Sequence, residues 1–293
     1  MMLDRGEVLN WFASREILTE AVLAVLAMYL FIVHIFTARQ PFIEPAIFRD
    51  RNFSVGLVFI FIVGIILLAT MTLLPPFMQG LMGYPVIDVG YLLAPRGVGT
   101  MVAMMLVGRL SGRVDVRILI LLGLLLTSFS MWEMTLFNTD ISSWDIVRTG
   151  IVQGLGLGFI FVPLSTITFA TLAPRYRNEG TALFSLVRNI GSSIGISVVI
   201  TYLAQRTQMN HEVFASYITP FNAGLQQGMG TAALVTPKGL AMLNGEVTRQ
   251  ASLLAYLQDF RLMMWVSLCA IPLVLLLKAP KRGGGKEALA ILE

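Results

Sequence analysis

Apolar residues in this chain are gathered into seven solid runs, separated by shorter polar stretches. Each run is about 20 residues or longer, which is the length that crosses a hydrocarbon layer ~30 Å thick. Such segments must be helices because no water is available in lipid to satisfy backbone groups, and a β-barrel would show short alternating segments instead. The predicted spans are Glu16–Phe36, Phe53–Phe77, Val86–Leu110, Val116–Phe137, Trp144–Leu172, Thr181–Leu203 and Tyr256–Leu277.

The composition leads to the same fold class. Hydrophobic residues make up 56% of the chain and charged residues 13%, and the mean hydropathy is +0.77. Soluble domains hold about 45–50% apolar and about 25% charged residues, so a water-soluble fold could not hide this much apolar surface. The sequence therefore predicts an all-α polytopic membrane protein.

Lysine and arginine are distributed unevenly between the two sets of alternate loops. One set holds twelve, namely Arg39, Arg49, Arg51, Arg109, Arg113, Arg117, Arg175, Arg177, Lys278, Lys281, Arg282 and Lys286. The opposite set holds five, namely Arg5, Arg15, Arg206, Lys238 and Arg249. Positive loops are retained on the cytoplasmic side, so the N-terminus is expected outside and the C-terminus in the cytoplasm.

The first span stands apart from the other six because the polar stretch Thr37–Asn52 separates them. This predicts an N-terminal periplasmic segment (1–15), a linker helix (16–36), a cytoplasmic loop (37–52), a six-helix unit (53–277) and a cytoplasmic tail (278–293). The unit contains a long periplasmic loop, 204–255. Within it, Gly239–Phe260 has a roughly helical apolar face, which fits either a lid helix on the membrane surface or a short helix that continues into the last span. The second interpretation is preferred.

Enzymatic and metal chemistry find no support in the sequence. His34 and His211 are far apart, Cys269 is alone, and no cluster has metal-ligand spacing. The glycine run Gly154–Gly158 lacks the spacing of a phosphate-binding loop. We therefore expect no metal, no cofactor and no enzymatic activity, and nucleic acid is not among the expected partners.

Small residues at four-residue spacing recur in the spans, where they allow helices to approach closely. The predicted packing positions are Gly108, Gly112, Gly150, Gly154, Gly158, Gly191 and Gly195. Prolines within or at the ends of spans remove backbone donors and favour kinks. They are Pro75, Pro76, Pro95, Pro163 and Pro272.

Two arginines within spans are the most costly residues of the chain, since a charge at the centre of a bilayer costs at least ~2.5–3.5 kcal/mol. Arg96 lies ten residues into the third span, about 15 Å deep at 1.5 Å per residue. Arg188, followed by Asn189, lies above Gly191 and Gly195, so its stripe is predicted to face protein. Both arginines fit a structural role, bound to backbone carbonyls, as well as a role in a transport path.

Carboxylates in the spans bear on proton coupling, which normally needs an acid within the membrane. Glu133, Asp88, Asp145 and Glu179 all lie in the outer or inner quarter of their spans. The expected titrating group is therefore Glu133 or a residue outside this chain. The methionines Met101, Met104 and Met105 fit either a tolerant substrate pocket or plain packing, and packing is preferred.

Several phrases together resemble one family, the EmrB/QacA-type drug:proton antiporters of the major facilitator superfamily. The phrases are Leu3-Asp4-Arg5-Gly6, Trp11-Phe12, Arg51-Asn52-Phe53, Leu74-Pro75-Pro76-Phe77-Met78-Gln79, Gly83-Tyr84, Ala94-Pro95-Arg96-Gly97, Gly108-Arg109-Leu110, Gln153-Gly154-Leu155-Gly156, Val162-Pro163-Leu164 and Val187 through Gly195. Their order and positions cover nearly the whole chain.

The resemblance implies that the chain corresponds to the C-terminal half of a fourteen-span transporter, with one linking helix before it. Gly108, Arg109, Asp115 and Arg117 then resemble a degenerate copy of the family's cytoplasmic signature. The expected function is multidrug efflux by drug:proton antiport in the inner membrane. The implied partners are the lipid bilayer, hydrophobic drug-like substrates, protons, an N-terminal half, a periplasmic adaptor and an outer-membrane channel.

Two other interpretations of the chain are open. A seven-helix receptor or retinal protein shares the predicted topology, although the last span has no central lysine for a retinal Schiff base, since Lys278 lies at its end. A non-transporting remnant or assembly subunit from a truncated gene also fits.

Overall fold

The computed structural model describes residues 14–37, 43–219 and 236–278, and within these ranges the regular structure is helical. The predicted N-terminal segment and cytoplasmic tail lie almost wholly outside the described residues. The long helices are α2 (Arg15–Thr37), α3 (Arg51–Pro76), α4 (Val86–Leu110), α5 (Val116–Met134), α6 (Ser143–Ala170), α7 (Arg177–Ser216) and α9 (Pro237–Cys269). Shorter helical turns are η2 (Pro45–Arg49), η3 (Phe77–Leu81), η4 (Pro174–Tyr176) and η6 (Ile271–Leu276).

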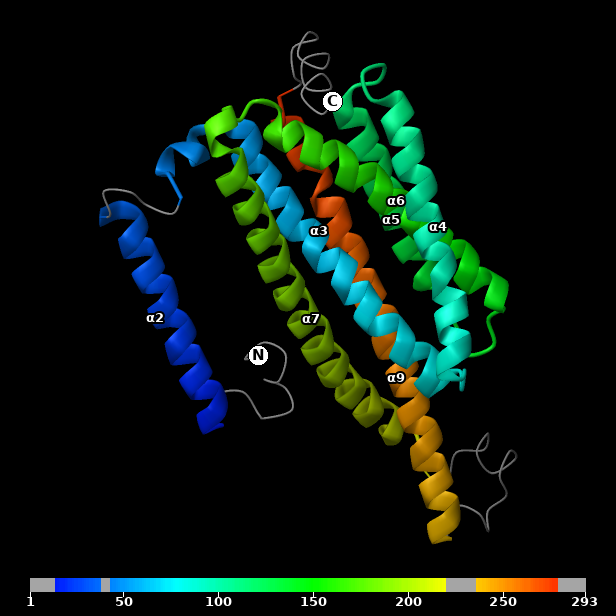
Figure 1. Cartoon of the computed structure of the whole chain (residues 1–293). Coiled ribbons are helices and arrows are strands. Elements are labelled where there is room, and N and C mark those ends of the chain that lie inside the picture. The colour runs from blue at the N-terminus through cyan, green and yellow to red at the C-terminus, as the bar shows by residue number, and fades with distance from the viewer. Residues whose placement is uncertain (1–13, 38–42, 220–235, 279–293) are drawn as a thin grey trace.

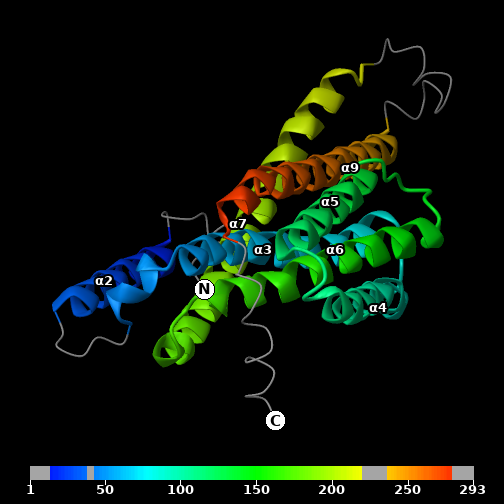
Figure 2. The same cartoon turned by 90° about the horizontal axis from the view of Figure 1, so that it is seen from above.

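Seven of these segments are long and apolar enough to cross a membrane, one at each predicted span. The predicted all-α polytopic fold class is therefore confirmed. Helices α3 to α9 form one bundle, whereas α2 stands at its edge in both views (Figures 1 and 2). Only 6% of the most apolar window of α2 is buried, compared with 61% for α6. The separation of one helix from the other six thus has a counterpart in the packing.

Helix α3 packs against both α6 and α7. Glycine makes the close approach to α7 possible, because a side chain at Gly191 would meet the backbone of Phe61 and one at Gly195 would lie 2.7 Å from the Cα atom of Ile65. The Ser192 hydroxyl donates across the same contact to the carbonyl of Gly64, at 3.1 Å. Small residues and a hydroxyl are the usual means of joining helices in lipid.

The expected 52-residue outer loop at 204–255 is wrong. Helix α7 continues to Ser216 and α9 already begins at Pro237, so both helices extend well past the predicted ends of their spans. The Asn210 side chain donates to the carbonyl of Ala251 at 3.2 Å, and His211 and Asn244 are hydrogen-bonded at 3.0 Å. Each extension supports the other, and the segment continues directly into the last span, as preferred above, so the lid interpretation is also wrong.

The apolar face predicted for this segment is only partly correct. Leu243 and Val247 are buried, but Leu240 is 52% exposed and Leu254 is 37% exposed. The buried positions follow a strict four-residue repeat that includes alanines, and a search for large apolar residues alone does not find such positions.

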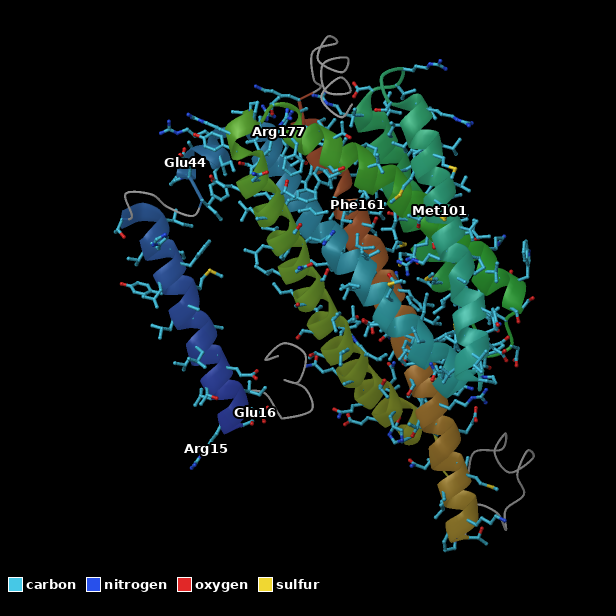
Figure 3. All side chains as sticks on the ribbon, in the orientation of Figure 1. Arg15, Glu16, Glu44, Met101, Phe161 and Arg177 are labelled. Atoms are coloured by element: carbon cyan, nitrogen blue, oxygen red, sulfur yellow. The ribbon has the colours of Figure 1, made fainter. Side chains whose placement is uncertain are left out.

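The two ends of the bundle carry different polar contacts. Figure 3 shows Glu44 and Arg177 at one end, and Arg15 and Glu16 at the other, where α2 begins. At the first end the side chain of Asn52 exchanges two hydrogen bonds with the backbone of Lys278, at 3.0 and 2.8 Å. The start of α3 is therefore fastened to the end of the last span.

Candidate functional site

Arg96 owes its position to the packing of α4 on α6. A side chain at Gly154 would meet the carbonyl of Arg96, and one at Gly150 would lie 3.8 Å from the Arg96 Cβ atom. Thr100 donates to the same carbonyl at 3.1 Å. Because α6 carries glycine here, the backbone of α4 lies almost against it, and Arg96 is only 5% exposed.

Most of the predicted packing glycines do lie at helix contacts. In addition to Gly150 and Gly154, a side chain at Gly158 would meet Ala103 of α4. Gly108 and Gly112 are the exceptions, since a Cβ at either position would meet nothing within 4 Å. Gly112 has a φ of 91° and lies in the turn between α4 and α5, where glycine is favoured for its conformation. The packing prediction for this pair is therefore wrong.

The guanidinium of Arg96 lies at a small apolar cavity between α3 and α4. The cavity has a volume of about 200 Å³ and is lined by Met71, Leu74, Pro75, Leu93 and Arg96. The Nη2 atom of Arg96 is buried and has no hydrogen-bond partner among the described residues. Arg96 is thus the one charged residue among the residues that line this cavity, and it has a buried donor that is unused within the described chain. We call this site the Arg96 pocket.

Gln153 forms a polar cluster on the neighbouring helices. It is fully buried, and its Nε2 atom donates to the Thr70 hydroxyl at 3.3 Å and lies 3.9 Å from the sulfur of Met131. Its Oε1 atom has no partner among the described residues. Thr70 is the neighbour of Met71 on α3, so this cluster adjoins the wall of the Arg96 pocket. A buried amide that is half satisfied resembles a site for a ligand or a water molecule.

Arg188 and Asn189 do not line this pocket. The carbonyl of Arg188 packs against Gly64 of α3, but its side chain is partly exposed and Asn189 is exposed. The backbone of this stripe thus faces protein, as expected from Gly191 and Gly195, while its polar side chains reach the edge of the bundle.

The predicted cytoplasmic signature lies at the turn between α4 and α5. Asp115 caps α5, its side chain accepting from the backbone N–H of Arg117 at 2.9 Å. Gly108 and Arg109 lie on the last, exposed turns of α4. Among the described residues no ion pair joins these side chains. The Asp115 carboxylate instead caps α5, the helix that it precedes.

Glu133 forms an ion pair with Arg148. Its Oε1 atom lies 2.7 Å from Nη2 of Arg148, in an ion pair between the last turn of α5 and the first turns of α6. Its second carboxyl oxygen is buried and has no hydrogen-bond partner among the described residues.

The buried acid of this bundle is Asp259 on α9, which sequence reasoning missed. It is fully buried, and neither of its carboxyl oxygens has a hydrogen-bond partner among the described residues. A signal was available, since Asp259 lies within the predicted span Tyr256–Leu277 and in line with its apolar repeat.

The methionines of α4 correct another expectation. Met101 is 59% exposed, Met104 38% and Met105 63%, and Met101 projects from the outer edge of the bundle (Figure 3). The preferred packing role is therefore wrong within the described part of the chain. Because α4 packs mainly on α6, its other face is open to lipid or to a partner.

Similarity to known proteins gives the family of this chain. Residues 10–196 match the Major Facilitator Superfamily. This chain belongs to that superfamily. This chain is 31% identical over 291 residues to the fatty acid resistance protein FarB of Neisseria gonorrhoeae. The match covers 97% of this chain and 57% of that protein. The chain is 27% identical over 292 residues to the multidrug export protein EmrB of Escherichia coli K12, covering 97% of this chain and 56% of that protein.

A third relative of this facilitator chain is the lincomycin resistance protein LmrB of Listeria innocua, at 25% identity over 195 residues, which cover 67% of this chain and 41% of that protein. The predicted family resemblance is confirmed. The chain spans a little over half the length of FarB and EmrB. The facilitator chain is thus a multi-pass membrane protein that matches part of these relatives.

Proposed function

We propose that this chain is the C-terminal half of an efflux transporter that exports apolar compounds by drug:proton antiport. The N-terminal half is supplied by a further segment or by a separate chain. The open face of α4 and the exposed side chains of Arg188 and Asn189 support this arrangement, since they leave polar and apolar groups uncovered at the edge of the bundle. Alternating access in such transporters is a rocking of two halves around a central site.

The Arg96 pocket is the observation that carries the proposal. Its wall is apolar except for one guanidinium whose Nη2 atom has no partner in the described chain. Ligand sites are mostly apolar, with a few polar groups that fix orientation. A cation at the wall selects an apolar compound that carries a negative group, such as a carboxylate or sulfonate. The name of FarB, a fatty acid resistance protein, fits such a substrate.

The transporter lies in an inner membrane with the N-terminus of this chain outside and its C-terminus in the cytoplasm. The excess of basic residues in one set of loops supports this orientation. A periplasmic adaptor and an outer-membrane channel are the further partners, supported by the resemblance to multidrug export proteins. The outward extensions of α7 and α9 offer surface to such a partner.

Binding of two matched amphiphiles tests the pocket. The chain is purified into lipid nanodiscs, and calorimetry compares decanesulfonate, which stays anionic, with decyltrimethylammonium, which has the same alkyl chain and the opposite charge. Loss of a hydrogen bond to a charged group costs about 1.5–3 kcal/mol. Arg96→Gln is therefore expected to weaken decanesulfonate binding by about 10- to 100-fold and to leave decyltrimethylammonium unchanged.

The matched control is Arg261→Gln, because Arg261 is an exposed arginine on α9. It should bind both amphiphiles as the wild-type chain does. Equal decanesulfonate binding by Arg96→Gln and the wild type would remove the pocket from the proposal, and a wild-type chain that binds neither compound would favour a non-transporting remnant.

A further inference from the structure

Asp259 interrupts a stripe that is otherwise apolar or small. From Leu243 to Ser267 every fourth residue of α9 is buried, and this row winds gradually around the helix because four residues exceed one turn of 3.6 residues. The members of this stripe are Leu243, Val247, Ala251, Ala255, Asp259, Met263 and Ser267. Asp259 is thus held at a core position by the helical repeat, and its exposed fraction is 0%.

Aromatic rings close the space on either side of this carboxyl group. Tyr256 and Phe260, which flank Asp259 on the same helix, pack against Phe77 with ring centroids 5.4 and 6.2 Å away. Phe137 packs on Phe260 at 6.4 Å. Because Phe77 follows the last turn of α3 and Phe137 follows α5, these rings lie toward the outer ends of the helices.

No cation satisfies the carboxyl group. The helices packed together here carry these other ionisable residues: Lys238, Glu246, Arg249, Tyr256, Arg261 and Cys269 on α9, Arg177, Glu179, Arg188, Tyr202, Arg206, His211 and Glu212 on α7, Arg117 and Glu133 on α5, and Arg51 on α3. Arg261 is exposed, Arg206 stacks on the ring of Tyr202 with 4.8 Å to the centroid, and Glu133 is paired with Arg148. Neither oxygen of Asp259 accepts a hydrogen bond within the described residues.

A second buried polar atom without a partner among the described residues lies on α7, which packs against α9. The antiparallel helices α7 and α9 are joined where Asn210 donates to the carbonyl of Ala251. The Thr201 hydroxyl is buried and also has no partner in the described chain.

The protonation of Asp259 follows from these surroundings. Moving an ionised carboxylate without a partner into an apolar medium costs far more than moving the neutral acid. Ionisable groups enclosed within membrane spans are retained where they serve a function. We propose that Asp259 is the proton-binding site of this chain: it holds a proton in the closed bundle and releases it when movement of α9 against α7 admits water.

The exchange role of this proton rests on the proposed antiport, whereas the binding of the proton by Asp259 does not. Asp259 adds a carboxyl group that the four acids considered from the sequence did not include. It also separates proton binding from substrate binding, since the Arg96 pocket is lined from α3 and α4 and not from α9.

Labelling with dicyclohexylcarbodiimide tests the proposal on the intact chain in its membrane. This apolar reagent modifies protonated carboxyl groups in apolar surroundings, and peptide mass mapping then locates the N-acylurea product. The internal reference is Asp140, an exposed aspartate in the turn between α5 and α6. We expect the label on Asp259 to exceed that on Asp140 by about tenfold at neutral pH and to fall as the pH is raised.

The controls are two matched substitutions. Asp259→Asn should abolish the label at this peptide, and Asp140→Asn should leave it unchanged. An unlabelled Asp259 at neutral pH, with labelled peptides elsewhere in the spans showing that the reagent has entered, would overturn the proposal. A label that does not change with pH would also overturn it, because the group would then never release its proton. Neither outcome depends on binding at the Arg96 pocket, so failure of the proposed function is seen separately.

Discussion

Arg96 and Asp259 are both ionisable residues enclosed in a helix bundle, but their surroundings differ. Arg96 is 5% exposed and lies at a cavity of about 200 Å³, whereas Asp259 is 0% exposed and lies in the close-packed stripe of α9. Arginine remains charged in proteins, while a carboxyl group can become neutral by binding a proton. The permanent charge of Arg96, beside a cavity, is suited to binding a ligand. The carboxyl group of Asp259, which can be neutral in a closed interior, is suited to binding a proton.

The helices that carry these two residues differ in the same way. Helix α4 packs mainly on α6 and exposes its methionines, so Arg96 is held at the edge of the bundle. Helix α9 packs on both α5 and α7 and buries a residue in every turn. Perturbing the contacts of one helix should therefore affect one site and spare the other.

The largest expected effect comes from Gly154→Ala. The added methyl group would meet the carbonyl of Arg96 and lie 3.0 Å from the backbone nitrogen of Thr100, so α4 must move away from α6. Overpacking of this kind costs about 1–3 kcal/mol, and contact with backbone puts this variant at the upper end. Thermal unfolding in micelles should show the loss, together with weaker decanesulfonate binding and unchanged carbodiimide labelling of Asp259.

Gly97→Ala is the matched control for this prediction, because a Cβ at Gly97, also on α4, meets nothing within 4 Å. It should be neutral or more stable by up to about 1 kcal/mol, since alanine favours helix. Equal destabilisation by both variants would show that the close approach of α4 and α6 does not hold Arg96 in place.

A second, smaller effect of opposite sign is expected from Asp259→Leu. Burying a polar group without a hydrogen bond costs about 1–3 kcal/mol in mutational data, so leucine should raise the free energy of unfolding by about 1–2 kcal/mol. Asp259→Asn keeps a buried polar group and should change it little. A large destabilisation by leucine would mean that the carboxyl group has a partner whose loss is costly.

The smallest expected effect concerns the join between α5 and α9. Ser128 and Ser267 are hydrogen-bonded at 2.9 Å, and both are buried. Hydrogen bonds between helices in membranes average ~0.6 kcal/mol, so Ser267→Ala should lower stability by about that amount, and a double-mutant cycle with Ser128→Ala should recover it as coupling. A coupling energy near zero would remove this contact from the packing of α9.

Hydrophobicity was sufficient to predict the helices but not their ends or contacts. Each of the seven predicted spans corresponds to a helix, because apolar runs of this length have few other structures available in lipid. The outer ends of α7 and α9 were missed because they leave the apolar run and support each other through polar contacts such as Asn210 with Ala251. Such contacts join residues far apart in sequence.

The candidate site was also predictable only in part, because its residues are far apart in the sequence. The cost of a charge in lipid drew attention to Arg96, and the structure adds Met71 and Leu74, which come from a helix that no local pattern connects to it. Asp259 was overlooked although it lies within a predicted span, because the sequence does not show which side of α9 is covered by other helices. Its burial depends on α5 and α7 packing over it, which is a property of the assembled bundle.

Gradient-driven transport tests the central claim, a ligand at Arg96 and a proton at Asp259, most directly. Inverted vesicles of the membrane that contains this chain are given an imposed pH gradient, acidic inside, and uptake of radiolabelled decanesulfonate is followed. The wild type should accumulate it, Asp259→Asn should lose accumulation but keep exchange of substrate at equal concentrations, and Arg96→Gln should lose both. Accumulation by Asp259→Asn at the wild-type level would contradict the account.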